Sequence, residues 1–244
     1  KDATAIAFNA GDVDMIVTDW IWTSRQRDAG ADFTFVPYSV AAGSVMVHPD
    51  SGIETLSDLR GKKIGVAGSP IDKSWLLLRA YTLKTFGEDM GKIAKPIYAA
   101  PPLLNEKFKQ REFDAVLNYW NYTARLRAAG MKELVKVQEL LPELGVPGRL
   151  PLIGYVFEEK WAKTNAKMLK TFFRASKMAR QIMLESDSEW ERLRPFTRAK
   201  NDATLIALRD GYRDGVPKTF GKKQEDAIRA AFKIVAEHGG RKLV

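Results

Sequence analysis

Residues 63–75 combine a strand-like run, a Gly-Ser break and a Lys-Ser pair, which is the general form of a phosphate-binding loop. The run Lys63-Ile-Gly-Val-Ala67 is followed by Gly68 and Ser69, and Lys73 then opens a helical pattern. A nucleotide loop requires G-x-x-x-x-G-K-[ST], because its second glycine lets the backbone wrap the phosphates. Here the spacing is one residue short and Asp72 precedes the lysine. Since a carboxylate there would repel phosphate, the sequence argues against a nucleotide site.

The same residues fit a simpler anion site, the N-terminus of a helix beyond the end of a strand. Backbone N–H groups at a helix N-terminus are unpaired and favour negative charge. In a doubly wound sheet, this place lies in the ligand crevice. We therefore expect Gly68 and Ser69 to contact a ligand. Ser69 alternatively caps the helix, which is the common role of such a serine, and the two roles are compatible.

Aromatic residues follow two other predicted strands. Trp20 comes after the run DMIVT, and Asn118, Tyr119 and Trp120 end or follow the run DAVLN. Tryptophans usually fill the core, but two strand ends that both carry polar and aromatic residues also suit the walls of one pocket. We predict that these residues line such a pocket and that the ligand lies between Ser69 and Trp20.

The composition leaves little material for catalysis. The 244 residues include no cysteine, which excludes cysteine nucleophiles and thiolate zinc sites, and only two histidines. We predict no catalytic residues, no metal and no cofactor. The net charge of +9 suits an anionic partner. Nucleic acid is disfavoured because aromatic residues do not interleave with the basic ones. No run of 18 apolar residues, the length a membrane span needs, occurs.

Strand and helix patterns alternate along the first part of the chain. This alternation predicts an α/β fold with a mostly parallel sheet covered on both faces. Residues 141–151 carry three prolines and two glycines and indicate a crossing, beyond which the chain is nearly all helical. The predicted strands are 14–18, 33–39, 44–48, 63–67, 96–99, 114–118 and 135–137, and the predicted helices are 20–29, 74–86, 102–110 and 122–129, with a single turn within 51–62.

A long helix from Lys160 to about Glu185 is predicted to have two contrasting faces. Leu169, Phe172, Phe173, Ala179 and Met183 gather on an apolar face that we expect to be core. The opposite face is basic, with no acid among residues 160–180; its residues are Lys160, Lys163, Lys167, Lys170, Arg174, Lys177 and Arg180. This Lys160–Arg180 face is either a solvated surface or a docking surface for an acidic partner.

The start of the chain already reads as a helix, DATAIAFNAG, ending at Gly11, with Lys1 in place of an initiator methionine. Because a domain rarely begins inside an element, we expect that a longer precursor was processed or that the first elements lie outside this chain.

Four segments carry a family resemblance: GDVDMIV, RDAGADFTFVPY, VHPDSGIETLSDLRGKKIGVAGS and FDAVLNYWNYTARLRAAG. In this order they resemble the solute-binding proteins of bacterial ABC importers for nitrate, taurine and alkanesulfonates. The resemblance implies a monomeric periplasmic protein of the second topological class, which binds a small molecule, serves an inner-membrane permease, and closes two lobes about a two-strand hinge. One lobe would combine residues 1–50 and 147–244 and lack an N-terminal strand-helix-strand unit with part of the ligand site. The other would span 51–146.

The family motifs also imply site residues. Its Gly-Ser or Gly-Thr that contacts the ligand's anionic group falls on Gly68 and Ser69. Its D-A-W-x-x-W-[DE]-P-Y motif is replaced here by DAVLNYWNY, which favours an acidic ligand with an aromatic or extended apolar part. Ser39 and Tyr155 complete the predicted set. The predicted ligand-binding residues are Trp20, Ser39, Gly68, Ser69, Asn118, Tyr119, Trp120 and Tyr155.

Two other functions fit the same scaffold. A pyrimidine synthase of thiamine biosynthesis resembles this family, but it depends on a cysteine-rich motif that this chain lacks. We therefore predict that the protein is not an enzyme. A ligand-binding sensor or an accessory module without transport remains the alternative.

Overall fold

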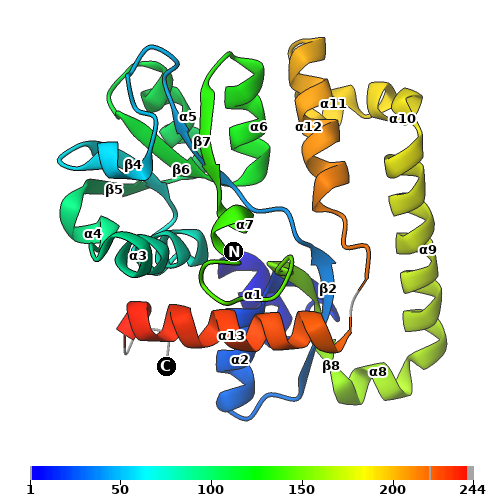
Figure 1. The fold of residues 1–244 in the computed structure, drawn as a ribbon. Helices are drawn as coiled ribbons and strands as arrows, with labels where there is room; N and C mark the ends of the chain where they lie inside the picture. The colour runs from blue at the N-terminus through cyan, green and yellow to red at the C-terminus, as the bar shows by residue number, and fades with distance from the viewer. Residues whose placement is uncertain (1, 220, 241–244) are drawn as a thin grey trace.

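The chain folds around two β-sheets that lie in separate halves of the molecule (Figure 1). The computed structural model describes residues 2–219 and 221–240. The larger sheet has the strand order β5-β4-β6-β3-β7 and the smaller has the order β1-β8-β2. The strands are β1 (Ile16–Asp19), β2 (Phe33–Ser39), β3 (Ser44–Val47), β4 (Lys63–Ala67), β5 (Lys95–Ala99), β6 (Ala115–Asn118), β7 (Lys132–Lys136) and β8 (Ile153–Glu158). The first six predicted strands are confirmed to within two residues at each end. The prediction for 135–137 overlaps β7 only at residues 135 and 136, and β8 was not predicted.

Helices cover the larger sheet and make up most of the chain after β8 (Figure 1). In the described part of the chain, none of them combines the length and apolarity needed to cross a membrane. The helices are α1 (Asp2–Asn9), α2 (Trp20–Asp28), η1 (Leu56–Leu59), α3 (Lys73–Phe86), α4 (Met90–Ile93), α5 (Pro101–Lys109), α6 (Trp120–Ala128), α7 (Val137–Leu140), α8 (Glu159–Thr164), α9 (Ala166–Glu185), α10 (Asp187–Arg192), α11 (Arg194–Thr197), α12 (Asp202–Gly215) and α13 (Lys222–Gly239).

The sheets are mixed, but they are less parallel than the alternation of elements predicts. Among the described strands, β4 pairs in parallel with β5 and with β6. The pairs β1–β8, β2–β8, β3–β6 and β3–β7 are all antiparallel. The reason is that β3 and β8, the first strands after each crossing, enter their sheets against the direction of their neighbours. The prediction of a mostly parallel sheet is therefore wrong.

The chain passes twice between the two sheets. Consecutive strands β2 and β3 belong to different sheets, so the first crossing is at residues 40–43. The second is between β7 in the larger sheet and β8 in the smaller one, and it includes the proline-rich segment 141–151. Two crossings that link two sheets are the arrangement expected of a two-lobe binding protein.

The C-terminal helices do not stay with the smaller sheet. Helix α12 packs against α6, and α13 packs against α3, so both contact elements of the larger sheet's half. Trp190, Leu205 and Leu208 share a buried cluster with Ala124 of α6. The sequence assigned residues 147–244 to the first lobe; within that range, α12 and α13 contact α6 and α3 of the larger sheet's half.

The predicted helix from Lys160 to Glu185 is two helices, α8 and α9, which are separated at Asn165. The Asn165 side-chain amide donates to the carbonyl of Trp161, the last turn of α8. The prediction of a core face is wrong, because no residue of α9 is fully buried and Phe172, a member of the predicted face, is 39% exposed. Figure 1 shows the reason: α9 stands at the edge of the molecule and packs on few neighbours.

Candidate ligand-binding site

The turn after β4 and the N-terminus of α3 form the first part of the predicted site. Gly68 has φ +85, in the left-handed region that glycine adopts freely. A Cβ at this position would lie 3.0 Å from the hydroxyl of Tyr119. That hydroxyl donates to the carboxylate of Asp72, with an O–O distance of 3.1 Å. The structure therefore brings two predicted residues, Gly68 and Tyr119, together around Asp72.

Asp72 rather than Ser69 caps α3. Its carboxylate accepts the backbone N–H of Ser74 at 2.9 Å. The Ser69 hydroxyl accepts only the N–H of Ile71, at a longer 3.4 Å, and Ser69 is exposed. Burial, with the neighbouring Asp72 carboxylate, raises the pKa of Tyr119 far above its usual range, so the phenol stays a donor. The helix N-terminus thus already holds a carboxylate of the chain itself.

A buried ion pair joins Asp19, the residue before Trp20, to the first turn of the helix that follows Ser69. Lys73 Nζ lies 3.1 Å from Asp19 Oδ2, and both residues are less than 10% exposed. Asp19 also caps α2 by accepting the N–H of Trp22 at 2.9 Å. Because Asp19 ends β1 of the smaller sheet and Lys73 begins α3 of the other half, the pair joins the two halves.

Trp20 and Asn118 are occupied by structural contacts. The Trp20 ring is 2% exposed, and its Nε1 donates to the carbonyl of Pro151 in the second crossing at 2.9 Å. The Asn118 amide donates to Pro101 and to Asn105 and accepts the N–H of Tyr119, each at 2.8 to 2.9 Å. In this conformation Trp20 fills the core, and Asn118 positions the turn that carries Tyr119.

A small aromatic cavity of about 80 Å³ lies where the first crossing meets α12. Two predicted residues, Ser39 and Trp120, line it together with Tyr38, Ile153 and Tyr212. Burial, and then the hydrogen bond with Tyr38, raises the pKa of Tyr212 to about 12. The Tyr212 phenol therefore remains protonated near neutral pH. We call this space the aromatic cavity.

Side chains of α12 and β8 complete the aromatic cavity. The Trp120 ring packs directly on Gly211, where an added Cβ would lie 3.1 Å from the ring. The predicted residue Tyr155 supports the cavity from behind, with its ring centroid 5.1 Å from that of Tyr38 and its hydroxyl 2.8 Å from that of Ser176. The Ser39 hydroxyl donates to the carbonyl of Gly215 at 3.2 Å, which ties α12 to the crossing.

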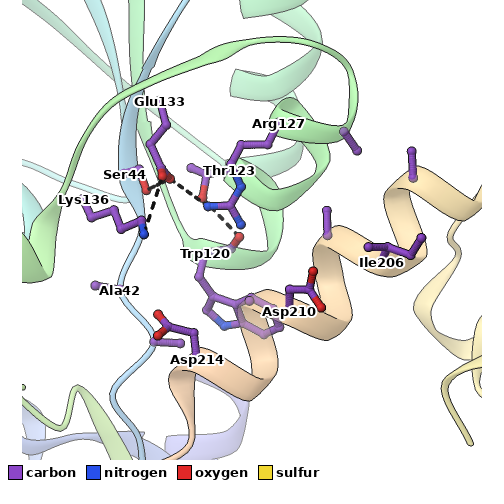
Figure 2. Close-up of a pocket in the computed structure, with 15 residues that line it drawn as sticks. Ala42, Ser44, Trp120, Thr123, Arg127, Glu133, Lys136, Ile206, Asp210 and Asp214 are labelled. Carbon is purple, nitrogen blue, oxygen red and sulfur yellow. Dashed lines mark hydrogen bonds and ion pairs between the residues drawn. The ribbon is translucent and has the colours of Figure 1, made fainter. Parts of the chain in front are cut away.

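A larger groove of about 640 Å³ opens beside the aromatic cavity and shares Trp120 and Ala41 with it (Figure 2). Glu133 lies at its centre. It accepts hydrogen bonds from Ser44 at 2.5 Å and from Arg127 at 2.8 Å, and Lys136 lies 3.9 Å away. Asp210 and Asp214 face these residues from α12 (Figure 2). Carboxylates thus outnumber cations among the residues that line this groove.

Sequence reasoning missed Tyr38 and Tyr212. Tyr38 lies next to the predicted Ser39 in β2, and the resemblance drew attention to the end of this strand. Tyr212 lies in α12, whose place beside α6 no local pattern indicates. A search of the described residues for metal-binding clusters of histidine, cysteine and acidic residues finds none.

Comparison with known families gives a direct assignment. A family model described as NMT1/THI5 like matches residues 2–189. The chain belongs to the NMT1/THI5-like family. A search of curated protein sequences finds no significant match.

Solved structures share the fold of this NMT1/THI5-like chain at low sequence identity. The periplasmic aliphatic sulphonate binding protein SsuA from Escherichia coli is 20% identical, with a TM-score of 0.77 over 99% of this chain and 75% of that one. The alkanesulfonate-binding protein SsuA from Xanthomonas axonopodis pv. citri, bound to MOPS, is also 20% identical, with a TM-score of 0.72 over 96% and 78%. The predicted resemblance to the sulfonate-binding type and the two-lobe α/β fold are confirmed.

The same fold also occurs in an enzyme. The desulfurization enzyme DSZB is 11% identical, with a TM-score of 0.62 over 92% of this chain and 78% of that one. The fold is therefore compatible with both binding and catalysis, and side chains rather than topology decide between them.

Proposed function

We propose that this protein is the extracytoplasmic solute-binding subunit of an ABC importer, that it lies in the periplasm, and that it captures a small organic anion by closure of its two lobes. Family membership and the fold shared with sulfonate-binding proteins support this proposal. The observation that carries it is the aromatic cavity at the junction of the first crossing, β8, α6 and α12. Closure about the crossings would change the distance between Trp120 and Tyr38, so a ligand held between them would favour the closed form.

The proposed ligand has an acidic group beside an aromatic or extended apolar part. Tyr38, Trp120 and Tyr212 offer ring faces for that second part, and one phenol proton is left beyond the hydrogen bond between Tyr38 and Tyr212. We propose no bond chemistry for the site, since its walls are rings, hydroxyls and aliphatic side chains. The Lys160–Arg180 face remains a predicted surface for an acidic partner, with the exception of Arg180, which lies over the Tyr38 ring.

Titration calorimetry with a panel of alkyl and aryl sulfonates and carboxylates tests the proposal. We expect at least one aryl compound to bind. Trp120→Ala should lower the affinity for that compound about tenfold, because an aromatic contact with its buried area contributes about 1.4 kcal/mol. Lack of binding by every compound to the wild type would refute the proposal. The importer role is tested by ligand-dependent stimulation of the ATPase of a reconstituted cognate permease. A sensor would bind its ligand and give no stimulation.

A further inference from the structure

A second cavity, of about 450 Å³, lies between the C-terminal half of α9 and the segment that follows α12. Lys177 and Arg180 line it from α9, and Arg213 and Lys218 line it from the end of α12 and beyond. Within the described residues, no acidic side chain lines this cavity. Four cations around one small volume produce a strongly positive potential. We call this space the basic pocket.

Arg180 is the most informative member of the basic pocket. Its guanidinium carbon lies 5.6 Å from the centroid of the Tyr38 ring, which turns the side chain inward. Its Nε is buried and has no hydrogen-bond partner among the residues that the structure describes. A buried donor without an acceptor is costly, and charged donors most of all. The position of this donor beside a cavity indicates that the acceptor is a bound group.

Arg213 is held in a fixed orientation on the same wall. Its Nε donates to the carbonyl of Met183 at 3.1 Å, and its Nη2 lies 2.7 Å from Asp187 Oδ1. Asp187 also pairs with Arg209 at 3.0 Å. Arg209 also pairs with Asp210 at 2.9 Å, so the two guanidinium groups share two carboxylates. The excess positive charge of the pocket therefore comes from Lys177, Arg180 and Lys218.

The basic pocket adjoins the aromatic cavity. Val216 lines both spaces, and the Tyr38 ring that lines the aromatic cavity also carries the Arg180 guanidinium. A ligand with an oxyanion at one end and a flat or apolar group at the other would match the two spaces together. Guanidinium groups suit the planar and tetrahedral oxygens of carboxylates, sulfonates and phosphates because they donate two parallel hydrogen bonds.

We propose that the basic pocket binds the oxyanion group of the solute, through Arg180 and Arg213 with support from Lys177 and Lys218. This assignment deepens the proposed function and rests on it for the organic part of the ligand. It differs from the sequence prediction, which placed the anion at Gly68 and Ser69.

The test uses the full chain in Tris chloride, because sulfonate buffers would compete. Calorimetry measures inorganic sulfate, inorganic phosphate, benzenesulfonate and benzoate against the wild type, Arg180→Gln and Lys170→Gln. Lys170→Gln is the matched control, since this substitution removes the same charge from an exposed position on the same helix. We expect Arg180→Gln to lower the affinity for every oxyanion that binds at least about tenfold, which is the effect of one charge-assisted hydrogen bond. Lys170→Gln should change these affinities less than about twofold.

Two further variants guard against a folding defect. Lys218 lies outside the helices at an exposed position. Lys218→Gln should therefore lower the affinity for the oxyanions about threefold, through the loss of charge alone. Arg180→Lys keeps the positive charge but loses the paired guanidinium donors. Its affinity for the oxyanions should therefore lie between those of the wild type and Arg180→Gln. Circular dichroism melting confirms that each variant is folded.

The outcomes separate the two proposals. Organic ligands that bind Arg180→Gln as tightly as the wild type would overturn the basic-pocket assignment and leave the proposed function intact. Sulfate binding that depends on Arg180, with no organic compound bound, would support the basic pocket and overturn the proposed function. Failure of the wild type to bind any oxyanion at millimolar concentration would overturn both.

Discussion

The N-terminus of α3 and the basic pocket both direct positive charge at a place where an anion would fit, but they differ in how that charge is used. At α3, the Asp72 carboxylate accepts the first-turn N–H of Ser74, and Asp19 pairs with Lys73 at 3.1 Å. In the basic pocket, Arg180 Nε has no acceptor among the described residues and no acidic side chain lines the space. The first region has its own carboxylates, whereas no described carboxylate lines the second, where Arg213 pairs with Asp187 outside the lining.

This difference shows that donors alone do not make an anion site. A helix N-terminus attracts an anion only while its N–H groups are unoccupied, and a capping aspartate satisfies them from within the chain. The groove of Figure 2 makes the same point with side chains, because Glu133 there accepts from Ser44 and Arg127. Although it is the larger space, it offers an incoming anion fewer free donors than the basic pocket.

Breaking the Lys73–Asp19 pair should have the largest effect in the α3 region. Lys73→Met removes the buried ammonium group that pairs with Asp19, so we expect the free energy of unfolding to fall by about 3 kcal/mol, measured by urea denaturation. The double variant Lys73→Met/Asp19→Asn should recover part of this loss, because asparagine still caps α2. A loss below about 1 kcal/mol would mean that the pair behaves as a surface ion pair, and the contrast with the basic pocket would weaken.

The turn at Gly68 should show a smaller effect. Gly68→Ala places a Cβ in the left-handed region and 3.0 Å from the Tyr119 hydroxyl, so we expect a loss of about 2 kcal/mol, measured by thermal unfolding. Gly130→Ala is the matched control, since Gly130 has φ +81 and open space around its missing Cβ. It should cost about 1 kcal/mol. Equal losses in both variants would show that Tyr119 does not constrain the turn.

Asp72→Asn should have the smallest effect and tests the comparison most directly. Asparagine caps helices about as well as aspartate, so the melting temperature should change by less than about 2 °C. Because the oxyanion is held in the basic pocket, its affinity should also stay within about twofold of the wild type. A tenfold gain of affinity would show that the α3 N-terminus binds anions once its carboxylate is removed, and would return the anion to Gly68 and Ser69.

Several features of the site were accessible from the sequence because they depend on neighbouring residues. The strand of residues 63–67, the turn at Gly68 and the helix after it follow from hydrophobic runs, a glycine and a capping aspartate within a few positions. The same holds for Tyr119 and Trp120 at the end of β6. The alternative role of Ser69 as the cap of this helix is wrong, because Asp72, three residues further on, has the extended backbone and the side-chain hydrogen bond of the N-cap.

The basic face of α9 shows the limit of such patterns. Helical periodicity grouped Arg180 with six other basic residues, yet Arg180 alone is placed over the Tyr38 ring. Its direction depends on the neighbouring ring of β2 and on the end of α12, which lie far away in the sequence. The apolar face of the same helix was expected to be core and is partly exposed, because burial requires a partner element that periodicity does not supply.

The sequence by itself determined the elements, the absence of cysteine chemistry and the family resemblance, because these depend on short-range patterns and residue types. Only the tertiary structure decided which charges are neutralised. Asp19 meets Lys73, Tyr38 meets Tyr212, and Arg180 is left facing a cavity because distant segments pack together around two chain crossings. The energy of a charge depends on every group within a few ångströms, and chain order does not specify those neighbours.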